Sequence, residues 1–423
     1  MATNPVIKVY CFGSEIGVLG WDEHRAVSLF QYHPDYLASN QFMNLIPGTG
    51  VISRVKEVQV FKKYNGDTFR GLPPIFADSL PDVFGNIIFK SWLESNNRNF
   101  ESISVIEQLA YVSDRGMGAL EYRPKKEIPP SASIHLGEIV EVLKEVLEIK
   151  GRTVSERLNH ESLLNIFKIG TSAGGARPKI LLSESKSDGS IVPGDINYSG
   201  DYEHYLVKLN VDDDLDYSRE MIEYAYYLAS TRCGIVMMDS KLIENRHFAT
   251  KRFDRIAGEK RHILTASGLT GWDFKDPANS SYENLFDLAL FLRIPHSEIE
   301  ELFRRMVFNV VFANNDDHLK NHSFVYDRLS DSWGLSPAYD ITYSLNPLMN
   351  FKRTSRALSI NNKRTDIGLE DIRQIARKYT IRSYASVIEE VQSNIAYWRI
   401  SASELGIPSR IIDSISRDFV FLQ

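Results

Sequence analysis

One short polar segment constrains this chain of 423 residues more than any other part of it. Residues 314–321 read Asn-Asn-Asp-Asp-His-Leu-Lys-Asn, and they directly follow the largely apolar stretch 306–313. Charged and amide side chains mounted on the end of a buried element are costly to desolvate unless partners or a ligand satisfy them. The sequence therefore predicts a functional site where a buried helix ends.

A second acid lies downstream, at the end of the segment Ser-Pro-Ala-Tyr-Asp at 336–340. Protein kinases transfer phosphoryl groups with one acid near the substrate hydroxyl, plus an amide and a second acid for metal. The alternative for 314–321 is a helix end at which Asp316 and Asp317 only cap local structure. The number of ligand-type side chains that converge here favours the functional interpretation.

Composition sets broad limits on the class of protein. Hydrophobic residues make up 43% and charged residues 25% of the chain, as in ordinary soluble globular proteins, and the length allows two or three domains. The net charge is −6 and the isoelectric point about 6.0, which argues against direct nucleic-acid binding through bulk charge. We expect DNA contact only through a partner.

The cysteines and the N-terminal sequence bear on the compartment. Cys11 and Cys233 lie far apart without metal-type spacing, so we expect two buried, reduced thiols. The first residues lack a basic region followed by an apolar one, and no stretch approaches roughly 18 apolar residues. We therefore expect a cytoplasmic protein without a membrane segment.

The pattern of predicted elements separates residues 1–125 from a second module, and the family resemblance given below divides that second module into 126–254 and 255–423. The first begins with strands and turns, including strands at 6–10 and 55–60, and continues with helices at 83–93 and 104–112. A proline-containing linker at 124–133 leads to a connecting helix at 136–149. The last module should be helical, with helices at 282–294, 298–312, 369–379 and 385–398.

A glycine-rich segment, 169–179, leads into a short strand at 180–182. Glycine permits positive φ, so successive N–H groups can point at one anion, and Lys179 adds charge. The alternative is an ordinary turn. The segment does not match the usual phosphate loop, because Pro178 precedes the lysine and Ile180 follows it.

Two further segments carry charge inside predicted strands. Lys208 lies in the apolar strand 205–209, either as an edge-strand lysine that reaches solvent or as a lysine directed at a nucleotide phosphate. Residues 249–255, Ala-Thr-Lys-Arg-Phe-Asp-Arg, form either an exposed charged strand or a hinge whose backbone holds adenine.

The order of these motifs resembles the HipA family, the serine/threonine kinase toxins of bacterial type II toxin–antitoxin modules. The motifs are Ser-x-x-Gly-Ala-x-x-Lys, a strand lysine, Arg-Phe-Asp-Arg, Asp-x-His-x-Lys-Asn and Pro-x-Tyr-Asp. The resemblance covers essentially the whole chain, and Asp-x-His-x-Lys-Asn is its most specific motif. It implies an α+β, protein-kinase-like two-lobed core, with an N-terminal β-containing domain and a mostly helical C-terminal lobe.

The resemblance also implies roles for individual residues. Asp316 matches the acid that accepts the proton of the substrate hydroxyl, and Asn321 and Asp340 match the two magnesium ligands. Ser172 matches the serine whose autophosphorylation ejects the loop and silences the kinase. Residues that match the nucleotide site are Lys179 and Lys208 near the phosphates, Lys251 and Phe253 at the hinge, and His318 and Tyr339 lining it.

Two departures from the best-known family member stand out. Arg177 and Pro178 replace Gln-Glu in the loop, and proline has no N–H to donate to a phosphate. Asp317 replaces a glycine directly after the catalytic acid.

As a family member, the chain would use ATP and Mg²⁺ to phosphorylate a protein, an aminoacyl-tRNA synthetase such as glutamyl-tRNA synthetase being the family's reported type. Its partner would be a HipB-like helix-turn-helix antitoxin that binds operator DNA. Two alternatives stay open: a small-molecule kinase, and an inactive binding subunit that holds the antitoxin on DNA.

Overall fold

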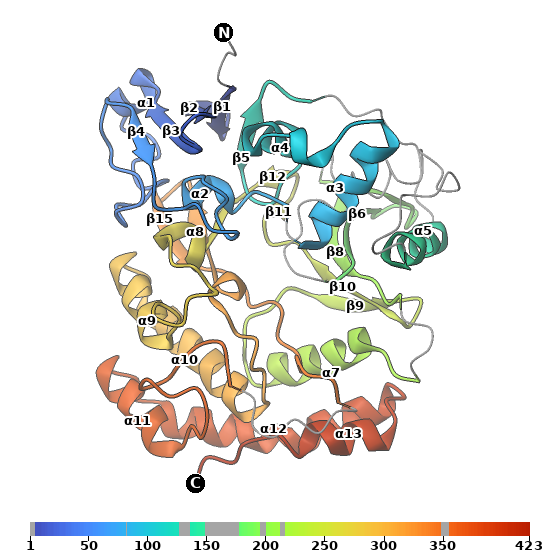
Figure 1. Cartoon of the computed structure of the whole chain (residues 1–423). Coiled ribbons are helices and arrows are strands. Elements are labelled where there is room, and N and C mark those ends of the chain that lie inside the picture. Colours follow the sequence, from blue (N-terminus) through green and yellow to red (C-terminus); the bar gives the residue numbers. More distant parts are fainter. Residues whose placement is uncertain are drawn as a thin grey trace. The chain divides into compact units, whose positions relative to one another are not determined.

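The structure, a computed structural model, describes residues 5–81, 83–126, 136–148, 177–194, 200–211, 216–347 and 355–423 (Figure 1). The chain forms two compact units. Unit 1 comprises Met1–Val211 and Ala249–Ile263, and unit 2 comprises Asp212–Phe248 and Leu264–Gln423. The predicted modules 1–125, 126–254 and 255–423 are divisions of the sequence and stay a prediction.

Unit 1 begins with a five-stranded sheet of order β4-β3-β2-β1-β5. Its strands are β1 (Val6–Cys11), β2 (Ser14–Asp22), β3 (Val27–Tyr32), β4 (Gln59–Phe61) and β5 (Leu120–Arg123). Ile7, Val9 and Cys11 alternate with more exposed residues along β1, so one face of the strand enters the core. The predicted strand at 6–10 is confirmed.

The predicted strand at 55–60 is wrong over most of its length, because only its last two residues belong to β4. The Gln59 side chain accepts a hydrogen bond from the Ser53 N–H and donates one to the Ser53 carbonyl, both at 2.8 Å. These bonds fold 53–58 back on itself as a loop and leave Val55 and Val58 exposed.

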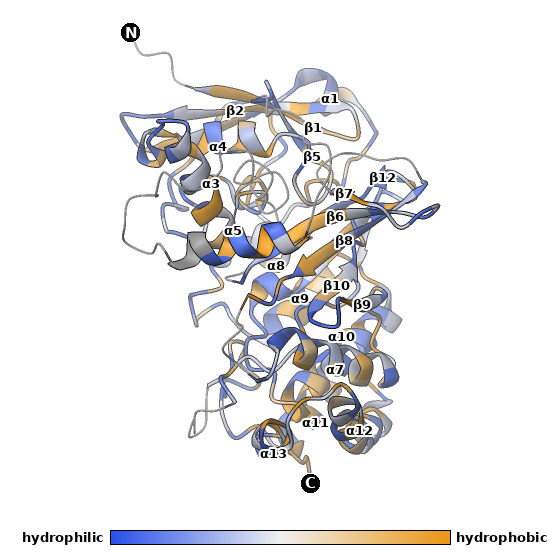
Figure 2. Cartoon of the chain, turned by 90° about the vertical axis from the view of Figure 1, so that its right-hand side faces the viewer, coloured by the Kyte–Doolittle hydropathy of each residue, from blue (hydrophilic) through white to orange (hydrophobic). Residues whose placement is uncertain are grey.

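The helices described in unit 1 are α1 (Pro34–Ala38), α2 (Pro74–Ala77), α3 (Val83–Ser95), η1 (Phe100–Ser102), α4 (Val105–Val112) and α5 (Leu136–Glu148). The three helices predicted for this unit, at 83–93, 104–112 and 136–149, are confirmed as α3, α4 and α5, and three short helices that were not predicted, α1, α2 and η1, accompany them. Ser104 caps α4 by accepting a hydrogen bond from the Glu107 N–H at 3.2 Å, which fixes the start of the helix. Figure 2 shows apolar and polar residues alternating along α5, as expected of an amphipathic helix.

A second five-stranded sheet has the order β7-β6-β8-β10-β9. Its strands are β6 (Lys179–Ser185), β7 (Ile191–Pro193), β8 (Tyr202–Lys208), β9 (Ser240–Ile243) and β10 (His247–Lys251). Strands β6 and β8 pair antiparallel over seven residues each (Figure 2), and most of their residues are buried. The predicted strands at 180–182 and 205–209 are thereby confirmed. A two-stranded hairpin follows, β11 (Arg255–Ile256) and β12 (Glu259–Lys260).

The charged segment after β10 is buried, so its interpretation as an exposed strand is wrong. Asp254 is fully buried and accepts two hydrogen bonds from Arg252, at 2.9 and 2.8 Å. Arg255 and the backbone N–H of Gly118 donate to the same carboxylate, each at 2.8 Å. Burial alone would raise the pKa of Asp254, but the two arginines hold it well below its ordinary value.

This buried cluster joins distant parts of unit 1. Arg255 also donates to the carbonyls of Gly116 and Gly118, at 2.8 and 2.9 Å. Gly118 has φ +79°, and a Cβ there would lie 3.3 Å from Ile263, so glycine suits this close approach. Lys260 adds a hydrogen bond to the Asp114 carbonyl at 2.8 Å. The segment 114–118 is thus held by the residues that follow β10.

Unit 2 contains most of the remaining helices. They are α7 (Arg219–Arg232), α8 (Ala266–Thr270), α9 (Tyr282–Phe291), α10 (His296–Val311), η2 (Leu319–Asn321), α11 (Leu369–Lys378), α12 (Tyr384–Glu404) and α13 (Ser409–Ser416). All four predicted helices after residue 280 are confirmed. The region from 255 onward also holds strands, among them β13 (His262–Thr265), β14 (Ser323–Asp327) and β15 (Ser332–Leu335), which form a three-stranded sheet.

An aromatic cluster supports the end of α10. Tyr226 from α7 packs edge-on against Phe308, Phe312 and Trp398, with ring centroids 6.4, 6.0 and 5.6 Å apart. Phe419 packs against Phe312 and Trp398 with centroids 5.0 Å apart. The Tyr226 hydroxyl donates to the Phe312 carbonyl at 2.8 Å, which satisfies a backbone group at the end of the helix.

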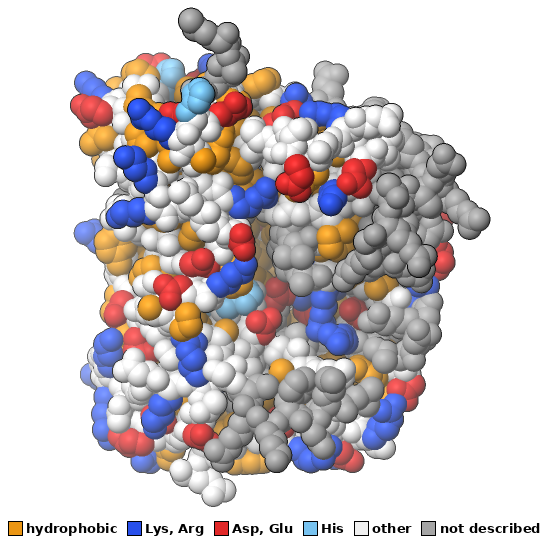
Figure 3. Space-filling model, viewed as in Figure 1, with side chains coloured by type: hydrophobic (Ala, Val, Ile, Leu, Met, Phe, Trp, Pro, Cys, Tyr) orange, Lys and Arg blue, Asp and Glu red, His pale blue; other side chains and the backbone are white. Residues whose placement is uncertain are grey.

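Three general expectations can be compared with the structure. Cys11 and Cys233 are both buried and unbridged. Within the described ranges, every helix is too short or too polar to cross a membrane. On the face drawn in Figure 3, basic and acidic side chains are interspersed, in keeping with a net charge of −6.

Replacement of Asp254 should strongly destabilise the protein. Asp254→Ala leaves two buried guanidinium groups without their carboxylate, so the free energy of unfolding should fall by about 3–5 kcal/mol. Urea unfolding followed by circular dichroism measures the change. The control is Asp413→Ala, which removes an exposed ion pair with Arg399 and should cost less than about 1 kcal/mol. Equal effects of the two variants would contradict the role assigned to the buried cluster.

Candidate functional site

The polar run 314–321 begins where α10 ends. Val311 is the last helical residue and Phe312 is the C-cap, and Ala313 has φ +54°, a left-handed conformation that turns the chain out of the helix. Such a conformation is unfavourable for a residue with a Cβ by about 1–2 kcal/mol and persists only where surrounding contacts enforce it. The turn places Asp316 on the surface, with its side chain 65% exposed.

The backbone of Asp316 is held from the C-terminal side of the loop. Asn321, at the end of η2, donates from its amide nitrogen to the Asp316 carbonyl at 2.7 Å. The His318 ring lies 4.0 Å from the Asp316 carboxylate, and Phe274 packs on it with ring centroids 4.8 Å apart. The ammonium of Lys320 lies 5.6 Å from the Phe274 ring centre. These contacts bring His318, Asn321 and the proposed catalytic acid together.

The downstream motif is tied to the same loop through Tyr339. Its hydroxyl donates to the Lys320 carbonyl at 2.8 Å and lies 2.5 Å from the hydroxyl of Ser323. The Ala338 N–H donates to the Val236 carbonyl at 2.8 Å, which fixes the backbone just before the tyrosine. Asp340 follows with φ +54°, a second left-handed non-glycine residue next to the loop.

The donor set suits magnesium, which prefers oxygen ligands. Because the Asn321 amide nitrogen is used within the loop, the amide oxygen lies on the opposite side of the group. That oxygen and the Asp340 carboxylate are the two predicted protein ligands. Across the described ranges, no group of three or more His, Cys, Asp or Glu residues could enclose a metal by itself.

Asp317 is buried, and its partners could not be predicted from the sequence. Its carboxylate accepts hydrogen bonds from the Tyr282 hydroxyl at 2.7 Å and from Arg356 at 2.5 Å. The Leu358 N–H approaches the other oxygen at 3.4 Å. The capping interpretation is therefore wrong for Asp317, because its partners lie far along the chain and not in the adjoining helix. Asp317, at which this chain differs from the best-known family member, thus anchors the loop to distant segments.

In unit 1 the two predicted phosphate lysines lie side by side. Lys179 on β6 and Lys208 on β8 are directly opposite in the antiparallel register, with exposures of 3% and 7%. The edge-strand interpretation of Lys208 is wrong, because β8 lies between β6 and β10 and the lysine is buried. Like charges directly opposite one another repel. Two adjacent lysines are well suited to polyanionic phosphate groups.

The other predicted nucleotide residues of unit 1 lie at the end of β10. Lys251 forms an ion pair with Glu203 on β8 at 3.0 Å, and both Lys251 and Phe253 are half-buried. Their role at an adenine hinge stays a prediction.

The glycine-rich loop falls largely outside the described residues, and so does Ser172. Its last two residues before β6 are described. Pro178 accepts a hydrogen bond at its carbonyl from the Leu209 N–H at 2.9 Å. This bond extends the pairing of β6 with β8, so Pro178 holds the start of the strand through its carbonyl. Without a backbone N–H, it cannot donate a hydrogen bond to a phosphate.

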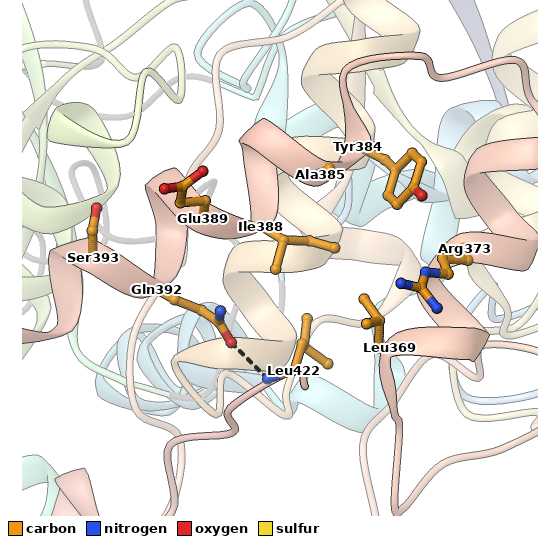
Figure 4. Close-up of a pocket in the computed structure, with 9 residues that line it drawn as sticks. All are labelled: Leu369, Arg373, Tyr384, Ala385, Ile388, Glu389, Gln392, Ser393 and Leu422. Carbon is orange, nitrogen blue, oxygen red and sulfur yellow. Dashed lines mark hydrogen bonds between the residues drawn. The ribbon is translucent and has the colours of Figure 1, made fainter.

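A separate cavity of about 430 Å³ lies in unit 2, between α11, α12 and the C-terminal segment (Figure 4). Leu369, Ile388 and Leu422 give it an apolar surface, and Arg373 and Glu389 supply charge at its rim. The Leu422 N–H donates to the Gln392 side chain at 2.6 Å, which secures the C-terminal segment. None of the predicted site residues lines this cavity.

Two family models match the chain. The HipA N-terminal domain matches residues 7–123, and the HipA-like C-terminal domain matches residues 171–398, more than half of the chain. The chain belongs to the HipA family. The segment that holds Asp254 therefore lies in the C-terminal family domain, and the glycines it binds lie in the N-terminal one.

The chain is also similar to a solved structure and to a curated protein. A HipA chain from the Shewanella oneidensis MR-1 toxin–antitoxin complex of HipA, HipB and operator DNA matches with a TM-score of 0.64 and 16% identity. The match covers 97% of both chains, and it confirms the predicted α+β fold of the HipA type. The curated protein "Putative kinase Y4dM" of Sinorhizobium fredii (strain NBRC 101917 / NGR234) is 24% identical over 181 residues. That match covers 41% of this chain and 43% of the relative's length.

A buried histidine beside the loop should make stability depend on pH. Burial lowers the pKa of His322 from 6.5 to about 4, with smaller effects of Asp317, Arg305 and His318. As pH falls from 6.5 to 4, the unfolded chain binds this proton first, so the free energy of unfolding decreases by up to roughly 1 kcal/mol per pH unit. Above pH 7 this contribution is constant.

Urea unfolding at closely spaced pH values measures this dependence. His322→Gln should reduce the slope between pH 4 and 6.5, to which the buried His204, His247 and His262 also contribute because burial lowers their pKa values as well. The control His24→Gln, at an exposed position, should leave the slope as in the parent protein. A slope that His322→Gln leaves unchanged would contradict the assignment.

Proposed function

We propose that this chain is an ATP- and Mg²⁺-dependent serine/threonine protein kinase of the HipA type. The observation that carries the proposal is the loop 314–321, which exposes Asp316 while its backbone is held by Asn321 and the loop is joined to Tyr339. An exposed acid on a fixed backbone is what proton acceptance from a substrate hydroxyl requires. Family membership and the full-length similarity of fold to HipA support the same conclusion.

The proposed reaction is transfer of the ATP γ-phosphoryl group. The acceptor hydroxyl oxygen forms a bond to the γ-phosphorus, and the bond from this phosphorus to the β–γ bridging oxygen breaks, releasing ADP. Asp316 takes the proton of the hydroxyl. Because this transition state needs little covalent help, positioning and charge neutralisation supply most of the acceleration.

Unit 1 would supply positive charge for the nucleotide. Lys179 and Lys208, adjacent on β6 and β8, would bind phosphate oxygens, and Lys251 and Phe253 would hold adenine through backbone groups. In unit 2, His318 and Tyr339 would line the nucleotide site.

Magnesium, when bound, would neutralise charge that develops on the β- and γ-phosphates. Asn321 and Asp340 would hold it, the first through the amide oxygen that its hydrogen bond to Asp316 leaves available.

Regulation and partners follow from the family. We propose that phosphorylation of Ser172 silences the enzyme, because an added charge of roughly −1.5 to −2 in the loop before Lys179 would oppose ATP phosphates. The complex that contains the Shewanella relative supports a HipB-like antitoxin as the partner, with DNA contacted through it. An aminoacyl-tRNA synthetase as acceptor, such as glutamyl-tRNA synthetase, stays a hypothesis from the resemblance.

The first test is self-phosphorylation. Incubation with Mg·ATP should add a single phosphate on Ser172, and Asp316→Asn should lower the rate by at least about 100-fold with the fold retained. Intact-mass and peptide mass spectrometry measure both. The matched control is Asp413→Asn, whose side chain is similarly exposed (60% against 65%) and should leave the rate unchanged.

Other outcomes separate the alternatives. Phosphate transfer that survives in Asp316→Asn would contradict the assigned acid. ATP binding without phosphate transfer to this chain, or to any added protein, would favour the inactive binding subunit. Transfer to an added sugar or antibiotic, but not to protein, would favour a small-molecule kinase.

A second test addresses the lysine pair. Each lysine that donates a charged hydrogen bond to phosphate contributes about 1.5–3 kcal/mol, so Lys208→Met should weaken nucleotide binding roughly 10- to 100-fold. Isothermal titration with a non-hydrolysable ATP analogue and Mg²⁺ measures the dissociation constant. Lys186→Met, at an exposed position just beyond the end of β6, serves as the control. Unchanged affinity in Lys208→Met would remove this lysine from the proposed site.

A further inference from the structure

Asp317 follows the proposed catalytic acid directly, yet the two side chains lie in opposite environments. Asp316 is 65% exposed at its side chain, and Asp317 is fully buried. Since neighbouring side chains on a fixed backbone point in different directions, the burial of Asp317 determines where Asp316 points. Whatever holds Asp317 therefore also orients the acid.

The group that holds Asp317 is a second charged residue from a distant segment. Arg356, 39 residues away in sequence and also buried, binds Oδ2 of Asp317 at 2.5 Å. The Tyr282 hydroxyl donates to the same oxygen at 2.7 Å, and the Asn309 amide donates to that hydroxyl at 2.9 Å. A buried carboxylate with a cation and a hydroxyl has one strongly favoured position.

The same network reaches the loop at two more points. Asn314 donates from its amide to Asn309 at 3.0 Å, which connects the first residue of the loop to α10. The Ala357 N–H donates to the Asn315 carbonyl at 2.8 Å, next to Arg356 in sequence. The loop is thus secured through Asn314, Asn315 and Asp317, and Asp316 is the residue that this anchoring leaves exposed.

We propose that Asp317 is a positioning residue for phosphoryl transfer, acting through its buried ion pair with Arg356 to orient Asp316. The proposal rests on the proposed kinase function. Asp317 touches neither the substrate nor the reacting atoms in this scheme. Its contribution should appear in the rate of transfer, because a misplaced acid still allows nucleotide to bind.

The direct test is Asp317→Asn, which preserves the size of the side chain and removes its charge. The maximal rate of self-phosphorylation should fall about 10- to 100-fold, while the ATP concentration at half-maximal rate stays within about twofold. Radiolabelled ATP over a range of concentrations measures both. The double variant Asp317→Asn with Arg356→Gln restores a neutral hydrogen-bonding pair and should recover part of the rate lost by Asp317→Asn alone.

A matched control separates positioning from loss of stability. Asp371 is also buried and paired, with Lys363 at 2.8 Å, and it caps α11 in the same unit. Asp371→Asn should lower the melting temperature without a comparable loss of rate when both proteins are assayed well below that temperature. Equal loss of rate in Asp317→Asn and Asp371→Asn, or a wild-type rate in Asp317→Asn, would overturn the proposal.

Failure of the proposed function would look different. If the parent protein transfers no phosphate to itself or to an added protein, the kinase assignment fails and the positioning role fails with it. If the parent protein transfers phosphate and Asp317→Asn does so equally well, the kinase assignment stands and only the positioning role is lost.

Discussion

The junction at the end of α10 is the constraint on which unit 2 depends. The apolar C-terminal end of α10, where Phe308 and the C-cap Phe312 pack against Tyr226, runs directly into a loop of charged and amide side chains. Such a change in polarity within a few residues is tolerated only if each buried polar group finds a partner. The unfavourable left-handed turn at Ala313 and the long-range partners of Asp317 are the two local features that make the junction possible.

In the described part of each unit, a fully buried carboxylate holds several segments together. Asp254 in unit 1 binds two arginines that flank it in sequence, whereas Asp317 in unit 2 binds an arginine from a distant segment. Buried ion pairs add little net stability compared with apolar packing, but removal of one partner is strongly destabilising. Their main effect here is to exclude other arrangements of the segments they join.

The elements that could be predicted from the sequence were those with local signals. Helix α4 begins at a capping serine, Ser104, and α10 shows the apolar periodicity that places the loop after it. The predicted strand at 55–60 failed because alternation alone does not reveal the hydrogen bonds between Gln59 and Ser53 that close a loop. Sequence patterns also could not show whether the strand of Lys208 lies at the edge or inside its sheet, because the order of strands depends on pairings between residues distant in sequence.

In the candidate site, too, the features with local sequence signals could be predicted and those that depend on distant residues could not. Asp316, His318, Asn321 and Tyr339 could be found by motif and lie together around one loop. The burial of Asp317 could not be found, because its counter-ion Arg356 lies 39 residues away. Asp254 has its counter-ions beside it in the sequence, but the Gly118 N–H that shares its carboxylate lies 136 residues away. A charged residue in a sequence looks exposed until its counter-ion is located. Similarly, the capping interpretation failed because no local pattern indicates Arg356.

The contacts of Asp254 with Gly118, and of Arg255 with Gly116 and Gly118, also bear on whether the two family domains can be separated. The two family domains are matched as separate stretches of sequence, which suggests modules that could be exchanged. Yet the N-terminal stretch supplies backbone groups that satisfy charges buried in its successor. A fragment that begins after residue 123 would lack those groups, and a foreign N-terminal domain would have to reproduce them. The two domains are therefore expected to be inherited together. The segment that contains Gly116 and Gly118 should vary least in sequence between relatives.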